Sequence, residues 1–324
     1  SKEVKSYEQS YLMVVLEKTA KWIFDTGAPL ETSPLLAGDT AFITTRDGYL
    51  KALDAETGKV KWSFRTDNPT EIYSSPRINN NLILFGADDN NFYAVRSNAA
   101  LKTYQVKTAN PIRASAFFSA DGNTTLIGST DKNLYAIGEK GAILWKYNAN
   151  AKILNTGVVN KQIVYIASDD GMLHAINLAD GVNLWTLALG GKMNTPVVNE
   201  NTLYVGGANT AVSAVDLSTH KVQWAYRLRQ DVSAPLSITG NILLIPCHDG
   251  IVSALDITTQ KPVWQFETKN SLSGGVAVSR KDGVVYFGSE DGYLYAVNLS
   301  NGKELWKYKT KNRIRSTPAI GNDI

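Results

Sequence analysis

Large aromatic residues recur along this chain at a nearly constant interval. Seven are tryptophans and a tyrosine fills the one wide gap; the eight positions are Trp22, Trp62, Tyr104, Trp145, Trp185, Trp224, Trp264 and Trp306. Successive members are separated by 40, 42, 41, 40, 39, 40 and 42 residues. A period of about 40 residues is typical of repeat proteins, and repeats of this length that consist of strands are typical of propeller blades.

Each repeat shows the pattern of four short strands. In the first complete repeat, a small, polar segment at 32–36 is followed by segments at 40–44, 49–54 and 60–64 in which apolar and polar residues alternate. Alternation with a period of two predicts strands with one buried face. Asp47-Gly48 separates the second and third segments, and glycine permits the positive φ that a hairpin turn needs. Each repeat therefore predicts one four-stranded antiparallel sheet.

Two incomplete repeats stand at the ends of the chain. Residues 11–24 match only the third and fourth strands, residues 316–320 match only the first strand, and seven whole repeats lie between them. We expect the two ends to share an eighth blade, with its second strand missing or supplied by the last few residues, because this closes the ring and removes exposed sheet edges. Residues 1–324 are thus predicted to form a single all-β domain, an eight-bladed β-propeller of four-stranded blades, with seven blades as the alternative.

The turn before the fourth strand carries the most specific motif. Residues 52–62 fit A-x-D-x-x-T-G-x-x-x-W at every fixed position, and 175–185, 214–224, 254–264 and 296–306 keep the alanine, an Asp or Asn, one of the Thr-Gly pair and the tryptophan. This pattern resembles the tryptophan-docking motif of the quinoprotein-like (PQQ-like repeat) β-propeller family. We expect a structural role for these tryptophans, each indole being buried between neighbouring blades: Trp22, Trp62, Trp145, Trp185, Trp224, Trp264 and Trp306.

Composition argues against several kinds of partner. The chain has 33 basic and 30 acidic residues and a formal net charge of +3, which is too small and too well mixed for a nucleic-acid footprint. No apolar run approaches the length that spans a bilayer. We therefore expect no nucleic-acid partner and no direct membrane insertion, and we expect a monomer.

The sequence also argues against catalysis. The dehydrogenases of the resembling family hold pyrroloquinoline quinone (PQQ) over a disulfide between adjacent cysteines and beside a calcium ion, but this chain has a single cysteine, Cys247. We therefore expect neither PQQ nor calcium and no catalytic residue, with a PQQ-dependent dehydrogenase as an alternative. The three histidines, His174, His220 and His248, fall in different repeats, which favours structural roles over a metal site.

The segments before the first strand of each repeat are expected to surround the mouth of the central channel, where propellers bind ligands. One column of residues there is mixed and is not explained by the repeat: Glu31, Tyr73, Arg113, Leu154, Met193, Val232, Leu272 and Arg315. We hypothesise that Glu31, Tyr73, Arg113 and Arg315 ring a mouth that binds an anionic or peptide partner, and that Arg315 pairs with Glu31 across a blade boundary. The alternative is a solvated rim with an ordinary surface ion pair.

The resemblance also suggests a function. Compact, cysteine-poor propellers with this motif resemble the periplasmic lipoprotein scaffold of the outer-membrane β-barrel assembly machine. This implies a non-catalytic, protein-binding scaffold in the periplasm or the extracellular cell envelope, whose partner is another subunit of that machine or an unfolded barrel precursor. The alternative is an extracellular sensor or ligand-binding domain.

Overall fold

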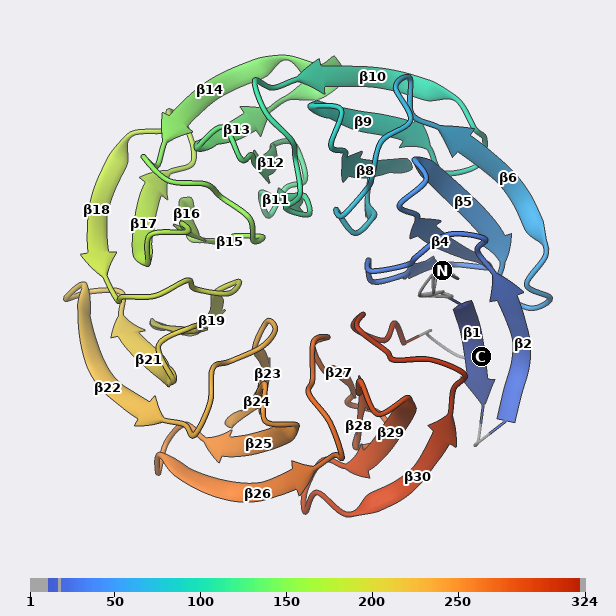
Figure 1. Cartoon of the computed structure of the whole chain (residues 1–324). Helices are drawn as coiled ribbons and strands as arrows, with labels where there is room; N and C mark the ends of the chain where they lie inside the picture. The colour runs from blue at the N-terminus through green and yellow to red at the C-terminus, as the bar shows by residue number, and fades with distance from the viewer. Residues whose placement is uncertain (1–10, 17–18, 321–324) are drawn as a thin grey trace, which may run out of the picture.

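The computed structural model describes residues 11–16 and 19–320, which form a ring of β-sheets around a central channel (Figure 1). Seven of the sheets have four antiparallel strands. Strands that are consecutive in the chain pair with each other, so the chain runs outward from the channel and then passes to the next blade. The structure thus confirms the prediction of an all-β propeller built from four-stranded antiparallel blades.

The two inner strands of each blade lie where the blades converge. The innermost strands have two or three residues and line the channel: β3 (Leu35–Ala37), β7 (Arg77–Asn79), β11 (Phe117–Phe118), β15 (Val158–Asn160), β19 (Val197–Asn199), β23 (Ser237–Thr239) and β27 (Ala277–Ser279). The second strands are almost wholly buried, because neighbouring blades cover both of their faces: β4 (Thr40–Thr44), β8 (Leu82–Gly86), β12 (Thr125–Gly128), β16 (Ile163–Ala167), β20 (Thr202–Gly206), β24 (Ile242–Pro246) and β28 (Val284–Gly288).

The two outer strands are longer. The third strands are buried except near their ends: β5 (Tyr49–Asp54), β9 (Asn91–Arg96), β13 (Asn133–Ile137), β17 (Met172–Asn177), β21 (Ala211–Asp216), β25 (Ile251–Asp256) and β29 (Tyr293–Asn298). The outermost strands alternate between exposed and half-buried residues: β6 (Val60–Arg65), β10 (Lys102–Lys107), β14 (Ile143–Asn148), β18 (Asn183–Ala188), β22 (Lys221–Arg227), β26 (Lys261–Glu267) and β30 (Glu304–Lys309). The described helix η1 (Glu139–Gly141) is a single turn, and no described helix could cross a membrane.

The prediction of eight four-stranded blades was wrong, because the structure has seven. Among the described strands, β1 (Tyr11–Leu16) and β2 (Thr19–Asp25) pair only with each other, and they lie between the last blade and the first (Figure 1). The described part of the C-terminal segment, 310–320, forms no strand. Two of its backbone N–H groups donate to the adjacent blades instead: the Ile314 N–H to the Ser289 carbonyl at 3.1 Å and the Thr317 N–H to Ser33 Oγ at 3.1 Å.

The predicted source of a further strand, the last few residues, lies at 321–324, outside the described residues.

The hydrophobic core lies between the blades rather than at one centre. In the cluster between the first two blades, Phe42 of β4 packs with Phe85 and Tyr93 of the next blade. The Phe85 and Tyr93 rings stack with centroids 5.4 Å apart, and the ring of Phe64 meets both edge-on. Similar clusters lie between the other successive blades, so the hydrophobic core is distributed around the ring.

The tryptophans sit at these boundaries. Trp145 Nε1 donates to the Leu178 carbonyl of the next blade at 2.8 Å, and a Cβ placed on Gly181 would lie 2.6 Å from the Trp145 ring. Gly181 has a φ of +74°, so glycine is needed here both for the turn and for the close approach of the indole. Trp22 and Trp264 make the equivalent contacts with the turns at 55–58 and 299–302.

The other tryptophans depart from this geometry. Trp185 stacks on His220 of the next blade, with ring centroids 4.8 Å apart, and His220 takes the glycine's place with a φ of 58°. Trp185 and the remaining three also pack against an aromatic ring in the second strand of their own blade: Trp185 on Tyr165, Trp62 on Phe42, Trp224 on Tyr204 and Trp306 on Tyr286. The motif thus tolerates a ring in place of the glycine where the two rings can stack.

Candidate functional site

The candidate site is built where two kinds of loop meet at one end of the channel. One loop leads into the innermost strand of a blade, and the other is the hairpin turn between its second and third strands. In every four-stranded blade, the residue before the turn Asp or Asn donates its N–H to a carbonyl of the lead-in loop, as Arg46 does to Pro29 at 3.2 Å and Glu290 to Ser271 at 3.0 Å. These backbone bonds bring side chains from both loops together at the rim.

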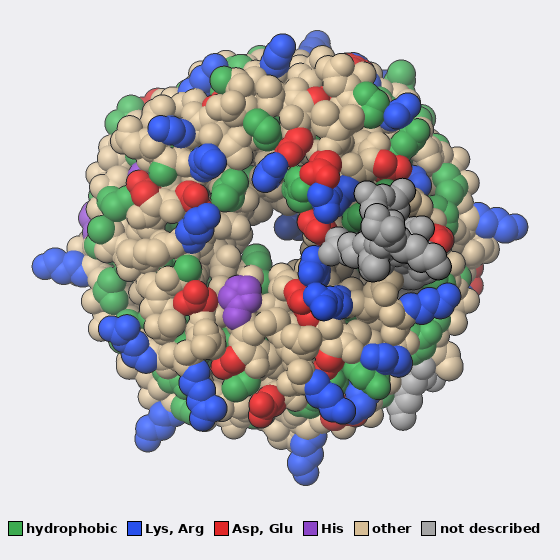
Figure 2. All heavy atoms as spheres, in the orientation of Figure 1, with side chains coloured by type: hydrophobic (Ala, Val, Ile, Leu, Met, Phe, Trp, Pro, Cys, Tyr) green, Lys and Arg blue, Asp and Glu red, His purple; other side chains and the backbone are tan. Residues whose placement is uncertain are grey.

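On one side of the rim, side chains from neighbouring blades form an unbroken series of contacts, which we call the mouth arc. Figure 2 shows basic and acidic side chains gathered around the channel opening. The mouth arc consists of Glu31, Arg46, Glu71, Tyr73, Asp88, Arg113, Glu290, Arg313 and Arg315.

Tyr73 lies at the centre of one half of the arc. The Arg113 guanidinium carbon lies 4.6 Å from the centroid of the Tyr73 ring and that of Arg46 lies 5.2 Å from it, so two cations lie close to one aromatic ring. Arg113 also holds Asp88 with two hydrogen bonds of 3.0 and 2.7 Å. The Tyr73 hydroxyl donates to Glu71, which also accepts from Arg46 at 2.5 Å.

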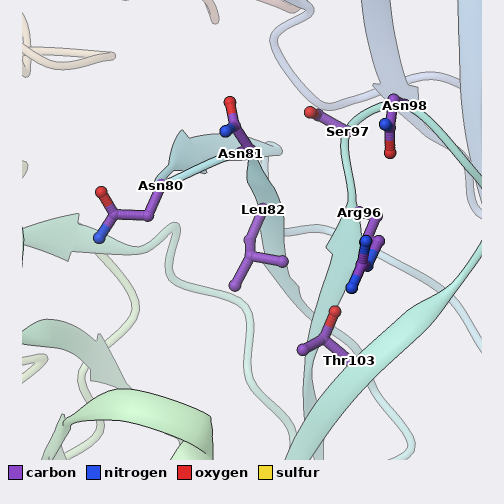
Figure 3. A pocket seen from close by; sticks show the side chains of 7 residues that line it. All are labelled: Asn80, Asn81, Leu82, Arg96, Ser97, Asn98 and Thr103. Atoms are coloured by element: carbon purple, nitrogen blue, oxygen red, sulfur yellow. The ribbon is translucent and has the colours of Figure 1, made fainter.

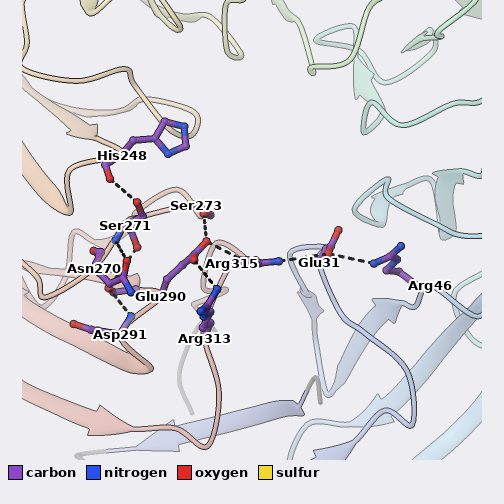
Figure 4. A network of polar contacts seen from close by, with 11 residues as sticks. Glu31, Arg46, His248, Asn270, Ser271, Ser273, Glu290, Asp291, Arg313 and Arg315 are labelled. Atoms are coloured by element: carbon purple, nitrogen blue, oxygen red, sulfur yellow. Dashed lines mark hydrogen bonds and ion pairs between the residues drawn. The ribbon is translucent and has the colours of Figure 1, made fainter. Parts of the chain in front are cut away.

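The other half of the arc crosses the gap between the last and first blades (Figure 4). Arg315 Nη1 lies 3.9 Å from Glu31 Oε1, and Arg315 Nε lies 3.2 Å from Glu290 Oε1. Glu31 Oε1 lies 3.5 Å from Arg46, which links the two halves. Glu290, whose side chain is 15% exposed, also accepts from Ser273 Oγ at 2.7 Å and lies 3.6 Å from Arg313.

The arc is internally balanced, with four arginines and four carboxylates. The hydrogen bond from Tyr73 and then the Arg46 guanidinium lower the pKa of Glu71. Burial and then the hydrogen bond to Glu71 raise the pKa of Tyr73. The hydrogen bond to Asp88 raises the pKa of Arg113. The ion pairs of the arc therefore present alternating charges to a partner rather than a surface of one sign.

The structure brings the four predicted mouth residues together. Glu31 and Arg315 lie within ion-pair distance, and Tyr73 and Arg113 stack. Three other members of the predicted column do not reach the rim: Met193, Val232 and Leu272 are buried. Met193 and Val232 pair instead with Gly207 and Cys247 in isolated bridges.

The partners of the predicted residues were missed from the sequence. Arg46, Asp88 and Glu290 each stand directly before the turn Asp of their blade. That position is charged in some repeats and neutral in others, as at Thr130 and Ala208, so its variation was a usable signal. Glu71 and Arg313 lie two residues before predicted mouth residues and were missed as well.

His174, His220 and Cys247 pack within or between the blades, whereas His248 is exposed. His174 is buried, with Nδ1 2.9 Å from the Tyr147 hydroxyl and Nε2 2.8 Å from Ser168 Oγ. His248 lies beside the arc, where its carbonyl accepts a hydrogen bond from Ser271 (Figure 4). Burial raises the pKa of the Cys247 thiol to about 12, which leaves it unreactive.

The residues present do not fit PQQ with its calcium ion. Among residues 11–16 and 19–320, no three His, Cys, Asp or Glu side chains are grouped so that they could hold a metal ion. The carboxylates of the mouth arc are each held by an arginine, and the one thiol has no second cysteine with which to form the disulfide.

A ring of antiparallel blades joined by docked indoles defines a quinoprotein-like β-propeller, which confirms the class predicted from the repeat. A family model described as "Outer membrane protein assembly factor BamB" matches residues 16–117, 105–242 and 248–324. The chain belongs to this family.

Individual relatives are more distant. The outer membrane protein assembly factor BamB of Yersinia pestis is 26% identical over 162 residues, which cover 48% of this chain and 32% of that protein. The chain thus matches only about a third of this curated relative's length. The crystal structure of BamB from Moraxella catarrhalis is 16% identical and superimposes with a TM-score of 0.76, covering 96% of this chain and 95% of that one, which shows a shared fold.

A shorter segment of the chain is similar to part of an enzyme. The quinohemoprotein alcohol dehydrogenase ADH IIB of Pseudomonas putida is 43% identical over 54 residues, which are 16% of this chain and 8% of that protein. A match of 54 residues is little longer than one repeat, so it shows a similar blade sequence.

Proposed function

We propose that the chain is a non-catalytic scaffold of the cell envelope, placed in the periplasm, which binds protein partners in outer-membrane protein assembly through the mouth arc. Membership of the assembly-factor family supports the process. The partner is a second subunit of the assembly machinery or an unfolded barrel precursor.

The mouth arc is the observation that carries this proposal. Tyrosine and arginine are the residue types that dominate binding energy in protein interfaces. Here Tyr73 and two arginines are stacked and held by carboxylates before any partner arrives, so little side-chain freedom is lost on binding. The alternating charges favour a partner surface of mixed charge over a simple anion.

A paired set of variants tests the proposal in the cells that make the protein. The double variant Arg46→Gln/Arg113→Gln should lower recovery of the assembly partner with the tagged, full-length protein by at least about tenfold, because loss of a central arginine commonly costs about 2 kcal/mol or more. Arg229→Gln is the matched control, because Arg229 is exposed and lies outside the arc. The amount of folded outer-membrane β-barrel protein should fall with the double variant and not with the control. Wild-type recovery with a folded double variant would contradict the proposal.

The alternative of a PQQ-dependent dehydrogenase has the short enzyme match in its favour. It predicts dye-linked oxidation of alcohols after incubation with PQQ and calcium. We expect no such oxidation, because the residues present do not fit the cofactor.

A further inference from the structure

The second blade departs from the repeat in the turn between its third and fourth strands. In five of the other six four-stranded blades this turn begins with an Asp or Asn whose side chain accepts backbone N–H groups, as Asp54 Oδ1 accepts from Glu56 at 3.1 Å and from Thr57 at 2.8 Å. The third blade has Gly138 there. The second blade has Arg96 in that place. A guanidinium has no acceptor atom, so it cannot close the turn in this way.

A pocket of about 490 Å³ lies at this departure (Figure 3). Its walls are the turn between β7 and β8, with Asn80 and Asn81, and the turn that follows β9, with Ser97 and Asn98. Leu82, Arg96 and Thr103 complete the lining. The Ser97 N–H donates to the Asn81 carbonyl at 2.9 Å, which holds the two walls together.

Most polar side chains of this pocket make no hydrogen bond within the described residues; Asn80, whose Nδ2 donates to the Gly122 carbonyl at 3.5 Å, is the exception. Within residues 11–16 and 19–320, the Arg96 guanidinium has no ion pair and donates no hydrogen bond, unlike the four arginines of the mouth arc. Over the same described residues, the side chains of Asn81, Ser97, Asn98 and Thr103 also make no hydrogen bond. The pocket therefore gathers one free cation, two free amides and two free hydroxyl groups.

We propose that this pocket binds a small, hydroxyl-rich anion, namely a sugar that carries a carboxylate or a phosphate. The planar fork of Arg96 matches either group with two parallel hydrogen bonds. The amides of Asn81 and Asn98 and the hydroxyls of Ser97 and Thr103 can each donate to or accept from sugar hydroxyls. Leu82 offers an apolar contact for a sugar ring, and the volume lies within the range of about 300–1,000 Å³ of small-molecule sites.

The pocket is separate from the mouth arc. It lies at the end of β8 that begins with Leu82, whereas Asp88 of the arc follows the other end of the same strand. Changes at the pocket can therefore be made without touching the proposed protein-binding site.

Calorimetric titration of the full chain with four compounds tests the proposal. Glucuronate and glucose 6-phosphate should bind saturably with one site. Glucose, which lacks the anion, and inorganic phosphate, which lacks the ring hydroxyls, should each bind at least about tenfold more weakly. If glucose bound as tightly as the acidic sugars, the role of Arg96 in binding an anionic group would be rejected. If inorganic phosphate bound as tightly, recognition of the sugar ring would be rejected.

Two variants locate the site. Arg96→Asp restores the residue that other blades use, so the chain should fold with unchanged or higher thermal stability while affinity for both acidic sugars falls at least about tenfold. Asn81→Asp places a negative charge in the opposite wall and should weaken both by a similar factor. Arg229→Gln is the control and should bind as the wild type does. Absence of saturable binding to the wild type, or undiminished binding to Arg96→Asp, would overturn the proposal.

Discussion

The Thr317 backbone N–H donates a hydrogen bond to the Ser33 hydroxyl at 3.1 Å and so joins two residues that are 284 positions apart. The same contact recurs between blades that are covalently continuous, where the Ser33 N–H donates to Ser75 Oγ at 2.9 Å and the Ser75 N–H to Ser115 Oγ at 3.0 Å. This part of the channel wall is thus a belt of hydroxyl acceptors that continues across the gap between the chain ends.

Removing this acceptor should loosen the ring at its one non-covalent joint. Ser33→Ala and Ser75→Ala each delete one such hydrogen bond, so each should lower the free energy of unfolding by about 1 kcal/mol. Only Ser33→Ala should speed hydrogen exchange of the Thr317 amide and proteolysis of the C-terminal segment, because no peptide chain crosses that joint. Equal exchange of this amide in the two variants would show that the belt does not close the ring.

Replacing Gly181, which contacts the Trp145 indole, should distinguish the stability cost of overpacking from the cost of backbone strain. Gly181→Ala adds a methyl group that would lie 2.6 Å from Trp145, at a φ of +74°. Gly240 has a φ of +54° with nothing within 4 Å of its would-be Cβ, so Gly240→Ala measures the strain alone. We expect urea unfolding to show an additional loss of about 1–3 kcal/mol for Gly181→Ala, which is the usual cost of overpacking. The same loss in both variants would mean that the indole does not press on the turn.

His174 should make stability depend on pH below neutrality. Burial lowers the pKa of His174 from its usual 6.5, while Asp170 opposes this to a lesser degree. The folded protein therefore binds this proton less readily than the unfolded chain, so stability is fully present above pH 6.5 and falls as the pH drops below that value.

His174→Tyr should remove this dependence. Tyr93, Tyr135 and Tyr295 occupy the same position in other blades and donate to their turn Asp at 2.5, 2.5 and 2.7 Å. The fall in melting temperature between pH 7.5 and pH 5.5 should be smaller in His174→Tyr than in the wild type. An identical fall would assign the dependence to other groups.

Acid should weaken the mouth arc through Glu71. The pKa of Glu71 is lowered by the Tyr73 hydroxyl and then by Arg46. The ionised side chain therefore adds to the free energy of unfolding above its usual pKa of 4.5, and this addition is lost as the pH falls through the lower pKa of the folded protein. Because the side chain is 44% exposed, the contribution should stay below about 1 kcal/mol. Urea unfolding at pH 7 and pH 3.5 should differ less for Glu71→Gln than for the wild type, whereas Glu56→Gln, outside the arc, should change this difference less.

The repeat could be predicted because it is local. Each blade is encoded within about 40 residues, so the recurring motif predicts an indole between neighbouring blades, as Trp145 is found against the turn at Leu178. The segment that closes the ring, residues 310–320, could not be predicted in the same way. The backbone N–H groups of Ile314 and Thr317 donate to Ser289 and Ser33 instead of pairing with a neighbouring strand.

The site was predictable only in part for a related reason. Glu31, Tyr73, Arg113 and Arg315 share a place in the lead-in loop and could be found as a column. Their partners lie in a different loop of the blade, and only the folded blade brings the two loops together. Val232 and Leu272 are buried like Ile72 and Ile112, so the sequence comparison placed them one position away from the rim residues of their blades, because the proline or its substitute does not stand at a fixed place in every lead-in loop.

Hydrogen exchange of the full-length protein, free and in its native envelope complex, tests the scaffold account most directly. The account predicts slower exchange in the complex at the loops of the mouth arc, residues 29–31, 71–73, 111–113 and 313–315, and unchanged exchange at the turns of the opposite face, such as 97–101 and 179–182. Protection of the opposite turns with the mouth loops unchanged would contradict it.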